Sequence, residues 1–251
     1  MEVINIHNKP LHAKNRFLES HRTNKETVHH TLKPPLPPLF FGGLKIMEQL
    51  NRLKEVLKRR YPGEQASILA EVLALAAEKG KISYEEIKCD EETKRNLLLL
   101  TYKERLLLPT GTSSASISLA WEDRTLKAEP GETYEMPNVI QHLILHAKET
   151  GEWNPETAVK NYLQEIGEPE TDKMLNIFKG IIEEVKNPTS QGTMVKIAPE
   201  TIQKVCQKHN LKINMNKLIV EFKGGGIISP NITSPPREGT ITYEINPSLI
   251  S

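Results

Sequence analysis

Apolar residues recur at helical spacing along most of the chain. The first clear stripe consists of Leu50, Leu53, Val56 and Leu57, which are three, three and one residues apart. This spacing places all four side chains on one face of an amphipathic helix. Tyr61-Pro62-Gly63 follows, and the proline and glycine end the helical pattern. The sequence therefore predicts a helix over 48–60 with one buried face.

Capping residues mark the ends of the other helices that the periodicity predicts. Gly80 follows an apolar run at the position of a C-terminal cap. Ser83 and Glu86 have the spacing of a capping box, and Asn154 precedes Pro155 as an N-cap precedes a proline in the first turn. Asn214 is predicted to cap the last long helix. The helices predicted in this way cover 48–60, 64–79, 84–88, 90–105, 155–166, 174–185, 199–209 and 215–223.

Short segments that favour extended structure lie between these helices. Alternating side chains in Thr240–Ile245 and the apolar Ile227–Ser229 predict a hairpin around a proline-rich loop at 231–239. Further short strands are predicted at 81–83, 106–109, 115–121 and 194–197, and residues 131–195 are otherwise predicted to be helical. The fold class that follows is α+β, mainly α with small β hairpins.

Length and composition limit the class of protein. The 251 residues suffice for one large domain or for two or three small ones, and with 37% apolar and 5% aromatic residues they suit small helical cores. Cys89 and Cys206 lie far apart and form no CxxC pair, which favours a reducing compartment. No apolar run approaches the roughly 20 residues of a membrane helix. We therefore expect a cytoplasmic protein without a membrane partner.

The formal net charge of +1 conceals an uneven distribution of charge. Residues 131–195 carry five basic and 11 acidic side chains, a net charge of −6. Residues 196–251 carry seven basic and four acidic side chains, a net charge of +3. Because phosphate binds basic surfaces, a nucleic-acid interface is expected at the C-terminal end and not in the acidic middle.

Residues 1–46 lack apolar periodicity and hold five of the eight histidines. Their proline-rich run at 32–39 favours polyproline II. We expect this segment to be a disordered basic tail. The alternative interpretations are a proline-rich ligand and a weak metal-binding tail. Gly42-Gly43 could be encoded by a ribosome-binding sequence, so we hypothesise that translation starts at Met47.

The rest of the chain is predicted to form three segments. They are an N-terminal domain (47–130), an acidic helical connector (131–168) and a C-terminal domain (169–251).

Motifs for catalysis or metal binding are weak. His142 and His146 are four residues apart on one predicted helix, a spacing that can hold a metal ion. No third ligand is evident, and no glutamate follows His142 as a zinc-protease motif requires. Lys223–Gly226 lacks the Gly-Lys-Ser/Thr ending of a phosphate loop and is explained as a helix cap. Thr112–Ser116 lacks the glycine-flanked serine of a nucleophile elbow. We therefore expect no enzyme activity, no cofactor and no metal.

The predicted element order from 169 to 250 is helix, strand, helix, turn, helix, strand, loop, strand. In this order the segment Pro199–Pro230 resembles the winged helix-turn-helix fold of many bacterial and archaeal DNA-binding proteins. Residues 64–121 show the same order more loosely. The resemblance implies tandem winged helix-turn-helix domains joined by helices, in an archaeal or bacterial protein that regulates transcription by binding double-stranded DNA.

In such a fold the second helix of the pair enters the major groove and the wing contacts the backbone. The resemblance therefore implies that Asn214, Asn216 and Lys217 meet base edges, since asparagine pairs with adenine and lysine with guanine. Phosphate contacts are expected from Lys204, Lys208, Lys212, Lys223 and Arg237. The alternative interpretation is that these residues are only a solvated helix surface.

The N-terminal copy is predicted not to read bases, because its second helix begins with Asp90-Glu91-Glu92 and repels phosphate, although Lys94 and Arg95 follow. We expect this copy, residues 47–130, to bind a protein partner or to form a homodimer through the leucine-rich helices at 48–60 and 90–105. The alternative function is a non-catalytic adaptor whose tandem winged helices bind proteins.

Overall fold

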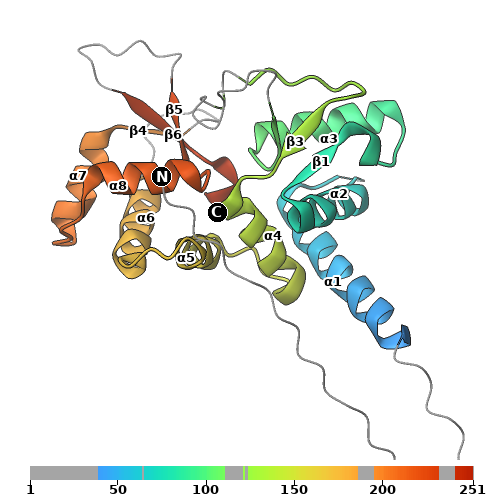
Figure 1. The fold of residues 1–251 in the computed structure, drawn as a ribbon, viewed down its shortest axis with the longest axis horizontal. Helices are drawn as coiled ribbons and strands as arrows, with labels where there is room; N and C mark the ends of the chain where they lie inside the picture. Colours follow the sequence, from blue (N-terminus) through green and yellow to red (C-terminus); the bar gives the residue numbers. More distant parts are fainter. Residues whose placement is uncertain are drawn as a thin grey trace, which may run out of the picture. The chain divides into compact units, whose positions relative to one another are not determined.

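The computed structural model describes residues 39–63, 65–110, 121, 124–185, 195–231 and 241–250. Leu39–Ser251 is one compact unit. Its described residues form eight α-helices and two three-stranded antiparallel sheets (Figure 1). The predicted α+β class, mainly helical with small sheets, is confirmed.

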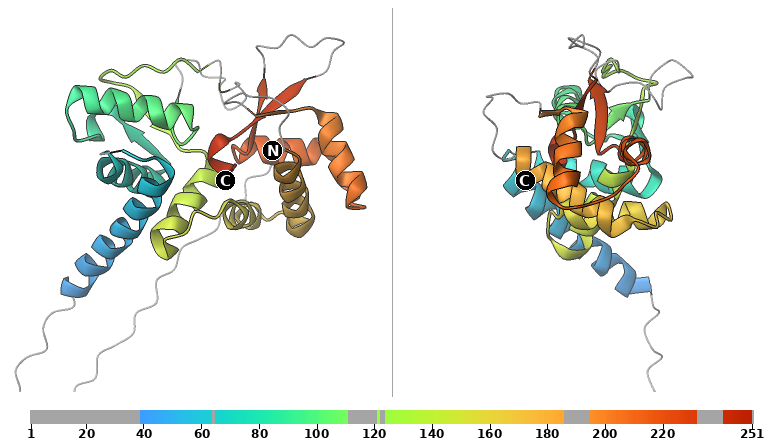
Figure 2. Two further views of the ribbon diagram at one scale, coloured as in Figure 1. Left: turned by 180° about the vertical axis from the view of Figure 1, so that it is seen from behind. Right: turned by 90° about the vertical axis from the view of Figure 1, so that its left-hand side faces the viewer.

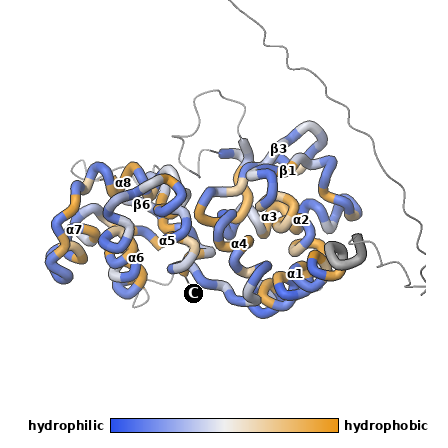
Figure 3. Tube along the Cα trace, turned by 60° about the horizontal axis from the view of Figure 1, so that its bottom comes forward, coloured by the Kyte–Doolittle hydropathy of each residue, from blue (hydrophilic) through white to orange (hydrophobic). Residues whose placement is uncertain are grey.

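The first two helices, α1 (Leu39–Arg60) and α2 (Ala66–Lys79), pack against each other. The predicted stripe of α1 is buried at Leu53, Val56 and Leu57. Helix α1 starts at Leu39, upstream of the predicted start at residue 48. Gly80 ends α2 with a φ of 73°, which confirms the predicted C-terminal cap. Hydrophobic and hydrophilic stretches alternate along these and the later helices (Figure 3).

The first sheet has the strand order β1-β3-β2. Its central strand β3 pairs antiparallel with both neighbours, with Ile82 opposite Tyr134 and Leu108 opposite Glu135. The Asp90 side chain caps α3 by accepting a hydrogen bond from the Thr93 amide at 2.9 Å. The elements of this part are β1 (Lys81–Ser83), η1 (Tyr84–Glu86), α3 (Glu91–Lys103), β2 (Leu108–Pro109) and β3 (Thr133–Glu135).

Strand β3 lies where the sequence predicts helix, so that prediction is wrong for Thr133–Glu135. Three residues are too few to show a period, and the strand is formed by partners that are distant in the sequence. Most of the strand predicted at 115–121 lies outside the described residues, and its last residue, Trp121, is not in a strand.

Three helices connect the two sheets. They are α4 (Asn138–Thr150), α5 (Pro155–Glu165) and α6 (Thr171–Val185). Helix α4 packs against α1, α2 and α5. The Asn154 side chain accepts a hydrogen bond from the Thr157 amide at 3.0 Å, which confirms the predicted cap of α5.

The second sheet repeats the strand order of the first. Its order is β4-β6-β5, so in both sheets the third strand in sequence lies between the other two. Figure 2 shows the red strands of the second sheet and the neighbouring orange helices from two further sides. Ile228 lies opposite Ile245, which confirms the predicted hairpin. The elements of this part are β4 (Lys196–Ile197), α7 (Pro199–Lys208), α8 (Met215–Gly224), β5 (Ile228–Asn231), β6 (Thr242–Ile245) and η5 (Pro247–Leu249).

A buried ion pair joins the two sheet-containing parts. The Arg105 guanidinium donates to both oxygens of the Glu244 carboxylate, at 3.1 and 3.3 Å, and the two side chains are 6% and 2% exposed. The Asn246 amide donates to the carbonyls of Arg105 and Gly226, at 3.3 and 3.1 Å. The residues after β6 therefore fasten the end of α3 to the end of α8.

The glycines after α8 do more than end the helix. Gly226 has a φ of 73°, and a Cβ there would lie 2.5 Å from the Cβ of Pro137. A Cβ on Gly225 would lie 2.5 Å from the Tyr162 ring. The predicted helix cap is present, and the absence of side chains also lets α8 approach α4 and α5 closely.

Candidate nucleic-acid interface

Helices α7 and α8 form the helix pair that the sequence predicts. Asn210 turns the chain with a φ of 50°, and the Leu211 amide donates to the Cys206 carbonyl at 2.8 Å. Ile202 and Leu218 bury the inner faces of the two helices. The outer faces are consequently held in a fixed orientation by apolar packing.

Asn214 serves as the N-cap of α8. Its side-chain oxygen accepts a hydrogen bond from the Lys217 amide at 3.2 Å, as the sequence predicts. Bidentate recognition of adenine uses both ends of an asparagine amide. Asn214 would have to give up the cap in order to read a base, so Asn216, whose side chain is exposed, is the better placed of the two asparagines.

The basic residues predicted to contact phosphate differ in their surroundings. Lys204 and Lys212 are exposed and form no ion pair with a described residue. Lys208 is exposed too, and its Nζ lies 3.1 Å from an exposed Glu184 oxygen, a weak and easily exchanged pair. Lys223 is half-buried and lines a cavity beside the first sheet. Arg237 lies outside the described residues.

Lys217 is held by an ion pair that the sequence did not reveal. Its Nζ lies 2.8 Å from an oxygen of Glu168, whose side chain is only 2% exposed. Glu168 stands in the turn before α6, and the Glu170 amide donates to the same oxygen at 2.8 Å. Removing Lys217 from this pair would leave a buried carboxylate without its cation, which is costly.

The two partners shift each other's protonation. The hydrogen bond to Glu168 raises the pKa of Lys217. Burial alone would raise the pKa of Glu168, but the bonds from Lys217 and from the Glu170 amide outweigh it, and the net pKa is lowered. Both groups are therefore charged at neutral pH, and Lys217 contributes to the fold instead of offering a free cation to guanine.

The corresponding helix of the first part, α3, presents a different surface. Glu91 and Glu92 are exposed in its first turn. Lys94 is buried, with its Nζ 4.1 Å from the centroid of the Tyr84 ring, and it also pairs with Glu91 at 3.3 Å. A buried lysine cannot reach a phosphate, so Arg95 is the one exposed cation in the first two turns of α3.

Each of these two helices also exposes one large apolar side chain. Leu99 of α3 is 58% exposed and Val220 of α8 is 64% exposed. An exposed apolar residue on a helix can contact a thymine methyl group or a protein surface. The helical periodicity did not single out either residue.

Of the other sites considered from the sequence, Thr112–Ser116 lies outside the described residues. A ring nitrogen of His142 lies 2.6 Å from Glu165. No group of three or more His, Cys, Asp or Glu side chains among the described residues could hold a metal ion. Within the same residues, no helix has the length and apolar character needed to cross a membrane.

Residues 51–251 match the model of a protein family whose description states no activity, ligand or partner. The chain belongs to this family. The match begins inside α1 and includes both sheets, the connecting helices and every candidate residue named above. No curated protein matches the chain, and no solved structure matches it.

Proposed function

We propose that the two sheet-containing parts are tandem winged-helix domains. In each, two helical segments separate the first strand from a closing pair of strands, and the strand order is first-third-second. Helices α2 and α6 would be the first helices of the two domains, with α3 and α8 as their recognition helices. The repetition of one topology in two stretches of the chain supports this proposal.

We further propose that the C-terminal domain binds double-stranded DNA and that the protein is a regulator. The observation that carries this proposal is that Lys204 of α7, Lys212 of the turn after it and Asn216 of α8 are all exposed. Lys208 adds a fourth polar contact when it leaves its exposed partner Glu184 and binds a phosphate instead. Asn216 would read a base edge, and the lysines would contact the backbone.

Two residues of the predicted interface take different roles in this proposal. Asn214 positions α8 as its cap, and Lys217 fixes α8 to the turn before α6. Val220, one helical turn beyond Asn216, would lie against a thymine methyl group. The α3 helix would not enter a groove, because its first turn is acidic and Lys94 is buried.

A second function, a non-catalytic adaptor, is favoured by one observation. Both recognition helices expose a large apolar residue, Leu99 and Val220. An amphipathic helix can bind a groove of another protein through exposed apolar side chains. In this case the protein would retain its fold without binding DNA, and Leu99 and Val220 would be its contacts.

Fluorescence anisotropy of the full chain with a labelled duplex tests the DNA-binding proposal. Lys204→Gln/Lys212→Gln should weaken binding by about tenfold, since two phosphate contacts are lost. Lys58→Gln/Lys160→Gln is the matched control, because these two lysines are also exposed and the change in net charge is the same. Equal weakening by both double variants, or no binding at low salt, would contradict the proposal and favour the adaptor.

A further inference from the structure

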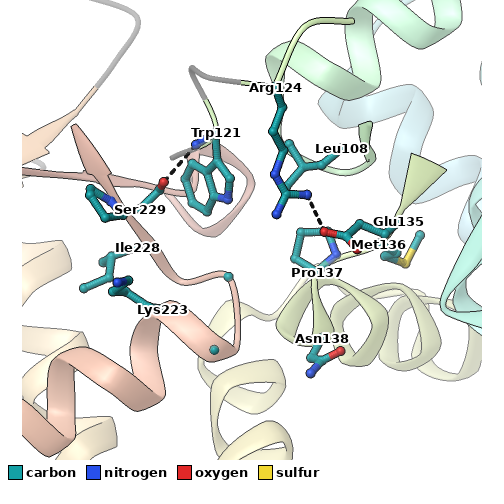
Figure 4. Close-up of a pocket in the computed structure, with 13 residues that line it drawn as sticks. Leu108, Trp121, Arg124, Glu135, Met136, Pro137, Asn138, Lys223, Ile228 and Ser229 are labelled. Carbon is teal, nitrogen blue, oxygen red and sulfur yellow. Dashed lines mark hydrogen bonds and ion pairs between the residues drawn. The ribbon is translucent and has the colours of Figure 1, made fainter. Parts of the chain in front are cut away.

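A cavity of about 210 Å³ lies where the two sheet-containing parts meet (Figure 4). Leu108 and Glu135 reach it from the first sheet, and Lys223 and Ile228 reach it from α8 and β5. The Trp121 amide donates to the Ser229 hydroxyl at 3.0 Å, a hydrogen bond that crosses between the two parts at the cavity wall. Residues far apart in the sequence therefore form one pocket.

The charged groups of the cavity sum to one positive charge. The Arg124 guanidinium donates to the Glu135 carboxylate and to the Pro109 carbonyl, the latter at 3.3 Å. Lys223 lines the cavity without an ion pair to any described residue. Asn138 opens helix α4 at the cavity, and the N-terminal end of a helix adds a partial positive charge. The lining therefore complements a monoanion.

Apolar side chains form much of the remaining wall, beside the polar Asn138 and Ser229. Trp121 is buried, and its indole faces Arg124 across the cavity in Figure 4. Leu108, Met136 and Pro137 continue this surface. An apolar cavity of roughly 150 Å³ holds a benzene molecule. The volume here therefore leaves room for one six-membered ring and one small charged group.

We propose that this cavity binds a small carboxylate that carries one apolar ring. The carboxylate would lie between Lys223 and the start of α4, with Arg124 at the edge of the site, and the ring would pack against Trp121. This inference is independent of DNA binding, because it uses neither Lys204, Lys212 nor Asn216. It assigns Lys223 to a ligand instead of to a phosphate of DNA.

Benzoate is the probe for the full chain, with ¹H–¹⁵N NMR as the readout. The chain has two tryptophans, so two indole N–H signals are expected. Addition of benzoate should shift the signal of Trp121. It should leave that of Trp153, whose indole donates to the Ser248 carbonyl at 2.9 Å, unchanged. Benzamide has the same shape without the charge and should bind at least about tenfold more weakly.

Two variants change the affinity in opposite directions. Lys223→Gln should weaken benzoate binding by about tenfold, because it removes a charge-assisted hydrogen bond. Glu135→Gln removes the anion that competes for Arg124 and should tighten binding. Lys212→Gln removes an exposed charge elsewhere on the same domain and should leave benzoate affinity unchanged. Thermal melting of each variant establishes that it is folded.

No shift of the Trp121 signal at millimolar benzoate would overturn the proposal. Equal affinity for benzoate and benzamide, or an effect of Lys223→Gln no larger than that of Lys212→Gln, would overturn it as well. Retained duplex binding together with a failure to bind benzoate would count against this site alone, whereas benzoate binding without duplex binding would count against the DNA-binding proposal alone.

Discussion

Lys217 has the side chain of a DNA-contacting residue, but its surroundings give it a structural role. Its position in the first turn of α8, the helix proposed to enter the major groove, predicts contact with a base. Its 2.8 Å ion pair with the buried Glu168 makes it a structural residue instead. Glu168 precedes it by many residues, and helical periodicity contains no information about such a partner.

The pair predicts a pH-dependent contribution to stability. The raised pKa of Lys217 means that its contribution is present below the ordinary lysine pKa and is lost as pH rises through the raised value. The lowered pKa of Glu168 means that its contribution is present above the ordinary carboxyl pKa and is lost as pH falls through the lowered value. The pair is thus fully stabilising at neutral pH.

Lys217→Met should lower the melting temperature at neutral pH, because Glu168 would remain buried as an uncompensated anion. Burial then raises the pKa of Glu168, which protonates in mild acid and no longer carries the penalty. The difference in melting temperature between the variant and the wild-type protein should therefore become smaller as the pH is lowered. Lys212→Met, at an exposed site, is the control. A difference that stays constant with pH would contradict the role assigned to this pair.

At the scale of elements, the predicted helices were found because their caps and stripes are local in the sequence. Asn154, Asn214 and Gly80 occupy the predicted cap positions. Strand β3 was missed because a three-residue strand has no measurable period and depends on β1 and β2 for its hydrogen bonds. The shared strand order of the two sheets is likewise a property of long-range pairing.

Gly80 and Gly226 allow a matched test of helix packing, since both have a φ of 73°. Gly80→Ala meets open space and should cost only the left-handed backbone penalty of about 1–2 kcal/mol. Gly226→Ala also brings its Cβ to 2.5 Å from Pro137 and should cost clearly more. Urea denaturation measures both free energies of unfolding. Equal costs would show that the close contact between α8 and α4 is unimportant.

At the scale of the whole chain, the junction between the two sheet-containing parts was beyond prediction from the sequence. Arg105 and Glu244 are widely separated, and each alone resembles a surface charge. Only the fold buries them together, and the cavity beside Trp121 exists for the same reason. The sequence supplied the residues of the α7–α8 surface, but it showed neither the ion pair that holds Lys217 nor the partial burial of Lys223.

Removing one partner of the buried pair should be strongly destabilising. Glu244→Ala leaves the Arg105 guanidinium buried without its anion and should cost about 3–5 kcal/mol of unfolding free energy. The double change Arg105→Met/Glu244→Leu should cost less than the single one, because no charge remains buried. Glu184→Ala, from an exposed pair, should cost less than about 1 kcal/mol. A double variant less stable than Glu244→Ala would contradict this account.

The central claim is that the α7–α8 surface binds the DNA backbone, and its most direct test is the salt dependence of duplex affinity for the full chain. Phosphate contacts by Lys204, Lys208 and Lys212 predict that the logarithm of the association constant falls with that of salt concentration with a slope of about −3. Lys204→Gln/Lys212→Gln should make the slope shallower by about two. A slope unchanged by these substitutions, or no measurable binding at low salt, would contradict the claim.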